Sequence, residues 1–428
     1  MLAYRALFAL ALAGYAPWAI ARSLAGKRRL GDLRGRLGRS RYPDLNGGVW
    51  IHAVSVGEIG VARNLIQALR RRLPTARLGV SVSTEAGRAL ADSALASQAS
   101  VFAFPFDLAG PVERALEGVR PGLILLTETE IWPLFLERAS RRGIPVAVVN
   151  GRISEHSFRR YRLVRRWLAT TLSRIALFAM QSQEDAQRIE ALGAPRARVR
   201  TPGNLKYDLE PAAEFPDASR LRAAAAGRPV VVAGSTGEGE EALVLDALSG
   251  PPHRPLLVLA PRRPERFGEV ASLVEKRNLR LLRRTSPVSL RPASDSPVDV
   301  YLLDSIGELA SVYAAAELAF IGGSLIPTGG QSPIEAWAAG VPAIAGPHME
   351  NFREAAARGE ALGLLSRVPD ALALGTAIAA ALDASEETAR RGREAAGFVA
   401  ASRGAAQATA DAVLALAPGL SAGPGSAT

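Results

Sequence analysis

The sequence of 428 residues contains no cysteine, four histidines and three lysines among its 52 basic residues. Without cysteine the chain cannot form disulfides, thiolate zinc sites or a cysteine nucleophile, and it suits a reducing compartment. The histidines lack the spacing of metal-binding motifs such as HExxH; they are His52, His156, His253 and His348. We therefore expect no metal site and no cofactor.

Arginine carries almost all of the positive charge, and the formal net charge is +11 at pH 7. Such a basic chain favours anionic partners, which include nucleic acid, phospholipid headgroups and phosphorylated substrates. Genomic composition explains the excess of arginine over lysine equally well. Lys206 stands out against this background, because lysine provides a compact point charge that arginine does not imitate.

The N-terminal run 5–20, RALFALALAGYAPWAI, is marginal for a membrane span, which needs about 20 apolar residues. AIA at 19–21 resembles a signal-peptidase site, so cleavage is the alternative. Many basic residues and a single acid within 22–41 favour a cytoplasmic flank instead. We therefore predict an uncleaved membrane anchor at 1–22, a basic juxtamembrane segment at 23–48 and a catalytic body in the cytoplasm.

Short apolar runs alternate with amphipathic segments of helical length from Val49 onward. Continuous apolar strands separated by helices indicate parallel sheets covered on both faces. The pattern pauses near 205–225, so we predict an α/β fold with two Rossmann-like, doubly wound domains, 49–212 and 213–417. We expect them to face a common cleft, because such sheets bind ligands beyond the carboxyl ends of their strands. The tail, 418–428, is low in complexity and is predicted to be disordered.

Polar residues follow the predicted strands of the first domain. Glu58, at the end of HAVSVGE, either complements the dipole of the following helix or takes part in chemistry. Glu128 and Glu130 in TETEIWP would point to opposite faces of an extended chain, or would cap the helix that begins near Pro133. Lys206 in GNLKYD is either an exposed linker cation or a charge that reaches the cleft.

The second domain contains two candidate phosphate sites. Arg262 and Arg263 directly follow a predicted strand and precede a helix, which suits phosphate binding. The segment 320–347 combines glycine pairs with a helix that starts at SPIE, where free amides can hold a phosphate and Glu335 can bind ribose. GEGEEA at 237–242 fits a dinucleotide fingerprint, but its acids would face the pyrophosphate, so we interpret it as an acid-rich helix start.

The segment FRRYRLVRRWL, 158–168, is predicted to be one helix with an apolar face and a basic face. It is either a surface helix with solvated charges or a face for membrane lipid or an anionic acceptor. The apolar face would contain Phe158, Tyr161, Val164 and Leu168, and the basic face Arg159, Arg162, Arg165 and Arg166.

Eight segments, in order from HAVSVGE at 52 to GGSLIPTGGQSPIEAWAAGVPAIAGPHMENF at 322, resemble the 3-deoxy-D-manno-octulosonic acid (Kdo) transferase family of lipopolysaccharide synthesis. The others are TETEIWP, NGRIS, QSQEDAQRIEALG, GNLKYD, GSTGEGEE and PRRPERF. The resemblance covers most of the chain. It implies a GT-B glycosyltransferase at the inner membrane, with CMP-Kdo as donor, a lipid A precursor (lipid IVA) as acceptor and no nucleic-acid partner.

The resemblance also implies roles for individual residues. Glu58 corresponds to the general base, and Glu128 and Lys206 correspond to residues that stabilise the transition state. The family commonly reads Gly-His-Asn-Pro where this chain has GQSP at 330–333, which leaves the nucleotide contacts of Gln331 open. The residues that correspond to CMP-binding segments are Pro261, Arg262, Ile306, Gly307, Glu308, Ser332, Pro333, Ile334 and Glu335.

In this scheme a carboxylate removes the proton of an acceptor hydroxyl as that oxygen attacks the donor sugar, and attack opposite the departing CMP inverts the anomeric centre. The alternatives are another GT-B glycosyltransferase, a sugar-nucleotide epimerase of the same architecture, or a non-catalytic protein that binds membrane or RNA. An epimerase would need neither the apolar N-terminus nor the polybasic flank. RNA binding would weaken steeply with salt.

Overall fold

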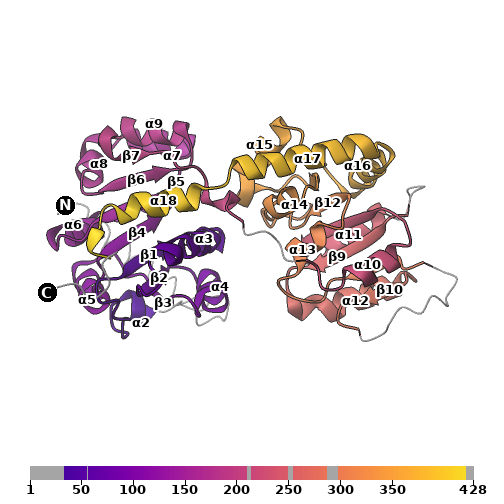
Figure 1. The fold of residues 1–428 in the computed structure, drawn as a ribbon, viewed down its shortest axis with the longest axis horizontal. Helices are drawn as coiled ribbons and strands as arrows, with labels where there is room; N and C mark the ends of the chain where they lie inside the picture. The colour runs from indigo at the N-terminus through magenta and orange to yellow at the C-terminus, as the bar shows by residue number, and fades with distance from the viewer. Residues whose placement is uncertain (1–32, 55, 210–213, 249–253, 287–296, 421–428) are drawn as a thin grey trace. The chain divides into compact units, whose positions relative to one another are not determined.

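The computed structural model describes residues 33–54, 56–209, 214–248, 254–286 and 297–420, which form two compact units (Figure 1). The first unit ends at Asp208 and resumes at Ser402, and the second is Leu209–Ala401. Each unit contains a parallel sheet covered by helices, which confirms the predicted α/β class. The predicted anchor at 1–22 lies outside the described residues. Within the described ranges, no helix has the length and apolarity that a membrane crossing requires.

The strand order in the sheet of the first unit is β3-β2-β1-β4-β5-β6-β7. The strands are β1 (Val49–Ala53), β2 (Leu78–Val82), β3 (Ser100–Ala103), β4 (Leu123–Thr127), β5 (Val146–Gly151), β6 (Leu177–Met180) and β7 (Val199–Arg200). The strands β1, β2, β4 and β5 are buried along their whole length, as expected for a parallel sheet with helices on both faces. Neighbouring strands therefore end together at one carboxyl edge.

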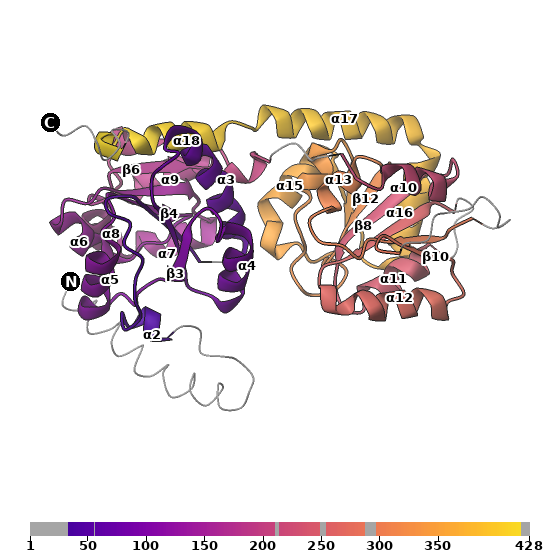
Figure 2. The same cartoon turned by 60° about the horizontal axis from the view of Figure 1, so that its bottom comes forward.

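Helices cover both faces of this sheet (Figure 2). The helices α3 and α4 pack on one face, and α5, α6, α8 and α9 contribute to the apolar cluster on the other. The helical elements up to Asp208 are α2 (Leu33–Arg36), α3 (Val56–Arg72), α4 (Glu85–Leu95), α5 (Ala109–Val119), α6 (Pro133–Arg141), α7 (Glu155–Arg162), α8 (Arg165–Leu172), α9 (Gln183–Ala191), and the 3-10 turns η1 (Arg196–Arg198) and η2 (Leu205–Tyr207).

The described part of the basic segment, 33–48, packs on the first unit. Leu45 is buried in the apolar cluster beneath α5, and the Arg114 side chain donates a 3.1 Å hydrogen bond to the carbonyl of Gly38. The sequence analysis placed the start of the first domain at Val49. The packing of Leu45 shows that the domain begins before that residue. The correction follows from Leu45, whose burial against the sheet a count of basic charges does not reveal.

The chain returns to the first unit at Ser402, whereas the sequence analysis assigned all residues up to 417 to the second domain. Helix α18 (Ala405–Leu414) packs against α3 (Figure 1), and its small apolar side chains are buried in the same core. The turn η5 (Pro418–Leu420) follows, and Leu420 also packs on this core, so the prediction of disorder is wrong for 418–420; the rest of the predicted tail lies outside the described residues. The alanine-rich stripe of α18 fits closely against a helix, but its sequence does not specify which sheet receives it.

The second unit contains a sheet with the order β10-β11-β9-β8-β12-β13-β14. The helices α11, α12 and α16 share one apolar cluster with it, α13 lies against the opposite side of β8, and α17 packs on α14. The strands are β8 (Val230–Thr236), β9 (Leu256–Pro261), β10 (Leu281–Arg283), β11 (Val300–Leu302), β12 (Leu318–Ile321), β13 (Ala343–Ala345) and β14 (Leu365–Arg367). The helical elements are α10 (Ala218–Ala225), α11 (Glu240–Ala247), η3 (Pro264–Arg266), α12 (Phe267–Lys276), α13 (Leu309–Tyr313), α14 (Ile334–Ala338), η4 (Glu350–Phe352), α15 (Arg353–Ala361), α16 (Ala371–Asp383) and α17 (Ser385–Ala401).

Candidate active site

Glu58 lies at the carboxyl edge of the first sheet. It belongs to the first turn of α3 and is only 5% exposed. The backbone N–H of Val54 donates a 2.9 Å hydrogen bond to its Oε2 atom, and the Thr127 hydroxyl lies 2.6 Å from the same oxygen. Val54 follows β1, and Thr127 ends the neighbouring strand β4. The carboxylate is therefore held between the ends of two adjacent strands and is not an exposed acid at a helix start.

The residues after β4 form a tight turn. Glu128 has a φ of 53°, a left-handed conformation that is uncommon for a residue with a side chain. Its backbone N–H donates to the carbonyl of Val149 at 2.9 Å, and the Thr129 hydroxyl accepts the N–H of Arg152 at 3.2 Å. These bonds attach the turn to β5 and to the loop after it. The extended geometry considered for Glu128 and Glu130 in the sequence analysis does not occur.

Lys206 forms an ion pair with Glu128, with 2.9 Å between Nζ and Oε1. The two side chains are 21% and 28% exposed, so the pair is partly shielded from water. Lys206 belongs to η2, and buried amides hold the backbone of that turn. Asn150 Oδ1 accepts the Leu205 N–H at 2.9 Å, and the Asn64 side chain donates to the Leu205 carbonyl at 2.7 Å. The structure thus brings Glu128 and Lys206 together, and Lys206 is not an exposed linker cation.

Asp208, which ends GNLKYD, binds the start of the returning helix. Its carboxylate accepts the backbone N–H groups of Gly404 and Ala406 at the N-terminus of α18. Negative charge is favourable at a helix N-terminus, where backbone amides have no partner within the helix. The loop that carries Lys206 is therefore attached to α18, a connection for which the sequence offered no signal.

Glu130 is a further candidate residue, to which the sequence analysis assigned no catalytic role. Burial raises the pKa of its carboxyl to about 7. That value includes smaller upward contributions from the negative charges of Glu58 and Glu128 and a downward contribution from a hydrogen bond with Trp132. The spacing of TETEIWP indicated a pair of acids, but the burial that raises the pKa of Glu130 depends on the fold.

Loops after four neighbouring strands meet at the carboxyl edge of the second sheet. The order β11-β9-β8-β12 is parallel throughout, so the residues that follow these strands lie along one edge. The residues predicted for CMP binding follow or end three of these strands; in strand order they are 306–308 after β11, 261–262 at the end of β9 and 332–335 after β12.

The loop after β9 presents two arginines. Pro261 is buried at the end of the strand, and the backbone N–H of Arg262 donates to the carbonyl of Thr236 at 3.1 Å. The side chains of Arg262 and Arg263 are exposed. Partial burial and the neighbouring charge of Arg263 lower the pKa of Arg262, but a guanidinium remains protonated in proteins. Both cations are therefore accessible to an anionic ligand.

The loop after β11 is held by an ion pair. The Glu308 carboxylate accepts hydrogen bonds of 3.0 and 2.9 Å from Arg284 and also contacts the Ser305 hydroxyl. Burial alone would raise the pKa of Glu308, but Arg284 and Ser305 lower it below its ordinary value. Gly307 adopts a φ of 85°, and Ile306 is 78% exposed. Glu308 therefore shapes the loop, and Ile306 projects from it.

The glycine-rich segment after β12 is built for close backbone approach. A Cβ atom on Gly322 would lie 2.5 Å from the carbonyl oxygen of Ser235, so only glycine fits beside β8. Gly329 adopts a φ of 89°, which glycine tolerates without strain. The Asn351 amide donates to the carbonyl of Thr328 at 3.0 Å and closes the loop.

The short helix α14 begins after this loop. The Ser332 hydroxyl accepts the backbone N–H of Ile334 at 3.3 Å. Pro333 and Ile334 are buried, whereas Ser332 and Glu335 are half-buried. A ligand at this helix start would therefore meet the side chains of Ser332 and Glu335 and only the backbone of the two residues between them.

The acids of GEGEEA support the second unit from inside. Glu240 is fully buried, and its two oxygens accept backbone N–H groups of Gly237, Gly323, Ser324 and Leu325 at 2.6 to 3.0 Å. Burial nevertheless raises the pKa of Glu240. Glu241 is also fully buried and binds Arg266 at 2.7 Å. These acids bind the protein itself, which agrees with the rejection of a dinucleotide fingerprint, and they lie in the first turn of α11, as the predicted acid-rich helix start requires.

The basic segment 158–168 forms two helices, α7 and α8, and not the single helix that was predicted. The break exposes Leu163 by 86% and Val164 by 47%, so Val164 does not belong to the buried face as expected. Leu168 is buried. The arginines predicted for the basic face are exposed, and they are Arg159, Arg162, Arg165 and Arg166.

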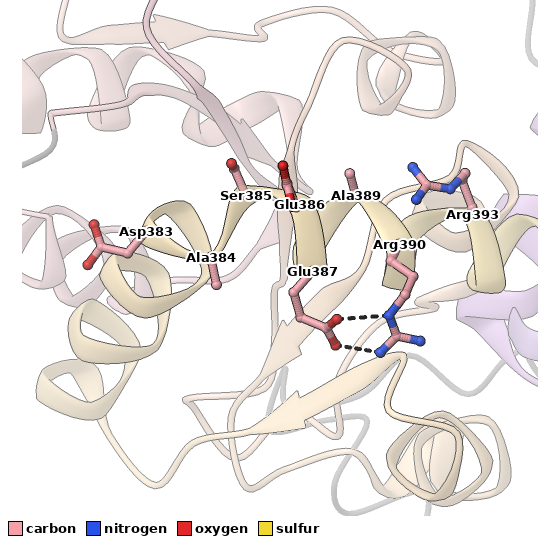
Figure 3. A pocket seen from close by; sticks show the side chains of 8 residues that line it. All are labelled: Asp383, Ala384, Ser385, Glu386, Glu387, Ala389, Arg390 and Arg393. Atoms are coloured by element: carbon pink, nitrogen blue, oxygen red, sulfur yellow. Dashed lines mark hydrogen bonds and ion pairs between the residues drawn. The ribbon is translucent and has the colours of Figure 1, made fainter.

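A surface hollow lies where α16 meets α17 (Figure 3). Figure 3 shows Glu387 and Arg390 pointing toward each other from α17, and their side chains form an ion pair at 2.6 Å. The rest of the lining is short or exposed side chains of the same two helices. None of the residues predicted for catalysis or nucleotide binding lines this hollow.

Solved structures with the same fold include both transferases and epimerases. The structure of Anabaena Alr3699/HepE in complex with UDP and glucose superposes with a TM-score of 0.53 and 16% identity. The match covers 86% of this chain and all of that chain. UDP-GlcNAc 2-epimerase from Neisseria meningitidis gives a TM-score of 0.54 with 12% identity, over 86% of this chain and all of that chain. At these identities the likeness establishes only the fold, which is the GT-B arrangement of two α/β domains.

Sequence comparison is more specific. Residues 28–209 match the family model described as 3-deoxy-D-manno-octulosonic-acid transferase (kdotransferase). The 3-deoxy-D-manno-octulosonic acid transferase of Bordetella pertussis is 37% identical over 437 residues, which cover 96% of this chain and 98% of that protein. The transferase of the same name from Haemophilus influenzae is 33% identical, over 89% of this chain and 90% of that protein. The chain therefore belongs to the 3-deoxy-D-manno-octulosonic acid transferase family.

Proposed function

We propose that this protein is an inverting glycosyltransferase that moves Kdo from CMP-Kdo to a lipid A precursor, lipid IVA. The observation that carries the proposal is the buried Glu58 carboxylate beside the Lys206–Glu128 ion pair, in a chain that belongs to this family. A sugar hydroxyl is a poor nucleophile at neutral pH. A carboxylate that takes its proton as the carbon–oxygen bond forms removes this difficulty.

In the proposed reaction, the acceptor hydroxyl oxygen attacks the anomeric carbon of Kdo from the face opposite the phosphate. The bond between this carbon and the phosphate oxygen breaks, CMP leaves with the electron pair, and the hydroxyl proton moves to Glu58. Lys206 offers a positive charge to the negative groups of the reactants, and Glu128 fixes its ammonium group at 2.9 Å. The geometry supports this assignment because Glu128 and Glu58 flank the same strand end.

The second unit binds the donor nucleotide in this proposal. The exposed guanidinium of Arg262 suits the phosphate of CMP, because arginine forms strong charge-assisted hydrogen bonds with phosphate. The half-buried Ser332 and Glu335 provide hydrogen-bonding groups for the ribose and the base. Gly307 and the loop around it lie on the same sheet edge and complete the nucleotide-binding set.

We also propose that the basic surface of α7 and α8 faces the inner membrane or the anionic acceptor, in addition to the predicted N-terminal anchor. The exposed Leu163 and Trp167 stand among four exposed arginines, which suits insertion of apolar side chains between anionic headgroups. Sedimentation with vesicles that contain an anionic lipid measures this contact. We expect Leu163→Ser to reduce the bound fraction, and an unchanged fraction would contradict a membrane role for this surface.

The decisive experiment is incubation of the protein with CMP-Kdo and a tetraacylated lipid A precursor, followed by mass spectrometry of the lipid. We expect the acceptor to gain Kdo and CMP to be released in equal amount. A matched reaction with UDP-GlcNAc tests the epimerase alternative through the appearance of its C2 epimer. Release of an epimer, or no gain of Kdo by the acceptor, would overturn the proposal.

A further inference from the structure

Glu58 has a second carboxyl group near it that the proposed mechanism does not use. Thr127, whose hydroxyl lies 2.6 Å from Glu58 Oε2, is the last residue of β4, and Glu130 follows three positions later, after the tight turn. That turn is fixed on both sides, by the N–H of Glu128 on β5 and by Thr129 against Arg152. These bonds keep the backbone that leads to Glu130 beside the end of β4, where Thr127 contacts Glu58.

We propose that Glu58 and Glu130 form a coupled carboxyl pair, in which Glu130 is a positioning residue that sets the basicity of Glu58. This inference rests on the proposed function. When Glu130 is ionised, its negative charge increases the proton affinity of Glu58 and makes it a stronger base. When Glu130 is protonated, Glu58 remains the only negative carboxylate of the pair and is a weaker base. The two acids therefore titrate as a unit.

The charges around the pair leave Glu130 as the group that titrates near neutral pH. Glu128, on the same turn, is neutralised by Lys206 of η2. On β1, His52 is fully buried, and burial lowers its pKa to about 3, so it is neutral above that pH. Arg36 of α2 acts on His52, and Arg152 follows β5 beside Thr129. Burial and the charge of Glu58 raise the pKa of Glu130 to about 7, which places its ionisation in the working range of an enzyme.

The sign of the expected pH dependence follows from this raised pKa. Below about pH 7 Glu130 is neutral, and above it both acids are ionised. The rate of transfer should therefore rise through pH 7 and reach a plateau. Because the rate follows base strength with a fractional slope, we expect a rise of about three- to tenfold. An isolated glutamate base with an ordinary pKa would show its rise near pH 4.5 instead.

The test compares the pH profile of kcat/KM for the wild type and for Glu130→Gln between pH 5.5 and about 8.5. Glutamine mimics neutral Glu130 in size, so the variant should be flat across pH 7, at the level of the wild type at low pH. Glu130→Asp keeps the charge and should keep part of the rise. Glu117→Gln, which removes an exposed acid on α5, is the matched control and should show the wild-type profile. A rise that persists in Glu130→Gln would overturn the inference.

A second measurement separates this inference from the proposed function. Infrared spectra of the unliganded full-length protein show the carbonyl band of a protonated carboxyl group directly. We expect a band that disappears with a midpoint near pH 7 in the wild type and is missing in Glu130→Gln. Absence of this band from the wild type would overturn the coupled pair even if the enzyme transfers Kdo. Presence of the band together with absence of transfer would refute the proposed function alone.

Discussion

Two acids at equivalent points of the two units have different surroundings. Glu58 lies in the first turn of the helix after β1 in the first sheet, and Glu240 lies in the first turn of the helix after β8 in the second. Both are buried. The Glu240 oxygens accept four backbone N–H groups, whereas Glu58 is held at Oε2 by the N–H of Val54 and the Thr127 hydroxyl. A carboxylate surrounded by backbone amides is a structural brace, and one that lies near another titratable side chain, as Glu58 does near Glu130, is suited to proton transfer.

The same contrast extends to the loops around these acids. At the edge of the first sheet, charged side chains such as Lys206 and Glu128 are partly buried and paired. At the edge of the second sheet, glycines bring the backbone close to the sheet edge, and Arg262 is exposed. The first edge therefore offers fixed charges for chemistry, and the second offers amides and cations for binding an anion.

The largest expected effect comes from Glu58→Gln, which removes the proposed base and keeps its shape. Transfer should fall by about 10²- to 10⁴-fold, because this is the usual contribution of a general base. Initial rates with CMP-Kdo measure the loss, and calorimetry with CMP measures binding, which should remain unchanged. Ordinary turnover in the variant would show that Glu58 is not the base.

The same substitution at Glu240 should damage structure instead of chemistry. A glutamine carbonyl cannot accept four N–H groups, and unsatisfied buried donors make Glu240→Gln less stable by about 3 kcal/mol. Hydrogen exchange should accelerate at the amides of 323–325, and the urea midpoint of unfolding should decrease. If Glu58→Gln causes the same acceleration at 323–325, the distinction between brace and base is wrong.

Next in size is the effect of Arg262→Ala on donor binding. Removal of a charge-assisted hydrogen bond to phosphate costs about 1.5 to 3 kcal/mol, so the KM for CMP-Kdo should increase about 10- to 100-fold. The neighbouring Arg263→Ala is the matched control, because that side chain is also exposed and the family resemblance assigns only Arg262 to CMP. Equal effects from both variants would mean that the sheet edge binds nucleotide through its overall positive charge and that Arg262 makes no specific contact with the phosphate.

The smallest effect concerns the ion pair between Arg284 and Glu308. The pKa of Glu308 is lowered in the folded chain, so its contribution to stability is present above the unfolded value of 4.5 and is lost as pH falls through the folded value. The pair is partly exposed, at 26% and 19%, which limits the contribution to about 1 kcal/mol. Urea unfolding of wild type and Glu308→Gln at pH 7 and pH 3 measures it. A difference between the two chains that is no smaller at pH 3 would contradict this origin.

The sequence predicted the two α/β units and the strand ends at which the candidate residues lie. Apolar runs and helical spacing are local properties, and Glu58, Glu128 and Lys206 stood out because they follow such runs. The pairing of Lys206 with Glu128 joins residues 78 positions apart in the sequence, and no local pattern specifies such a contact.

The features that the sequence did not predict depend on burial by distant parts of the chain. Glu130 and Glu128 both belong to TETEIWP, but burial raises the pKa of Glu130 to about 7, whereas Glu128 forms an ion pair with Lys206. The sequence indicated that the acids of GEGEEA begin a helix, but not that a loop more than 80 residues later encloses Glu240. The break between α7 and α8 at Leu163 is likewise not visible in the sequence, since helical spacing continues through it.

The attachment of Asp208 to Gly404 has a consequence for how the molecule is made. Because the chain leaves the first unit at 208 and re-enters it at 402, the second unit is an insertion within the first. On the ribosome, the lysine-bearing loop emerges long before the helix amides that bind its last acid. A fragment that stops at 208 lacks those amides and leaves the α3 surface uncovered. An isolated first unit should therefore be stable only when α18 is fused to its end.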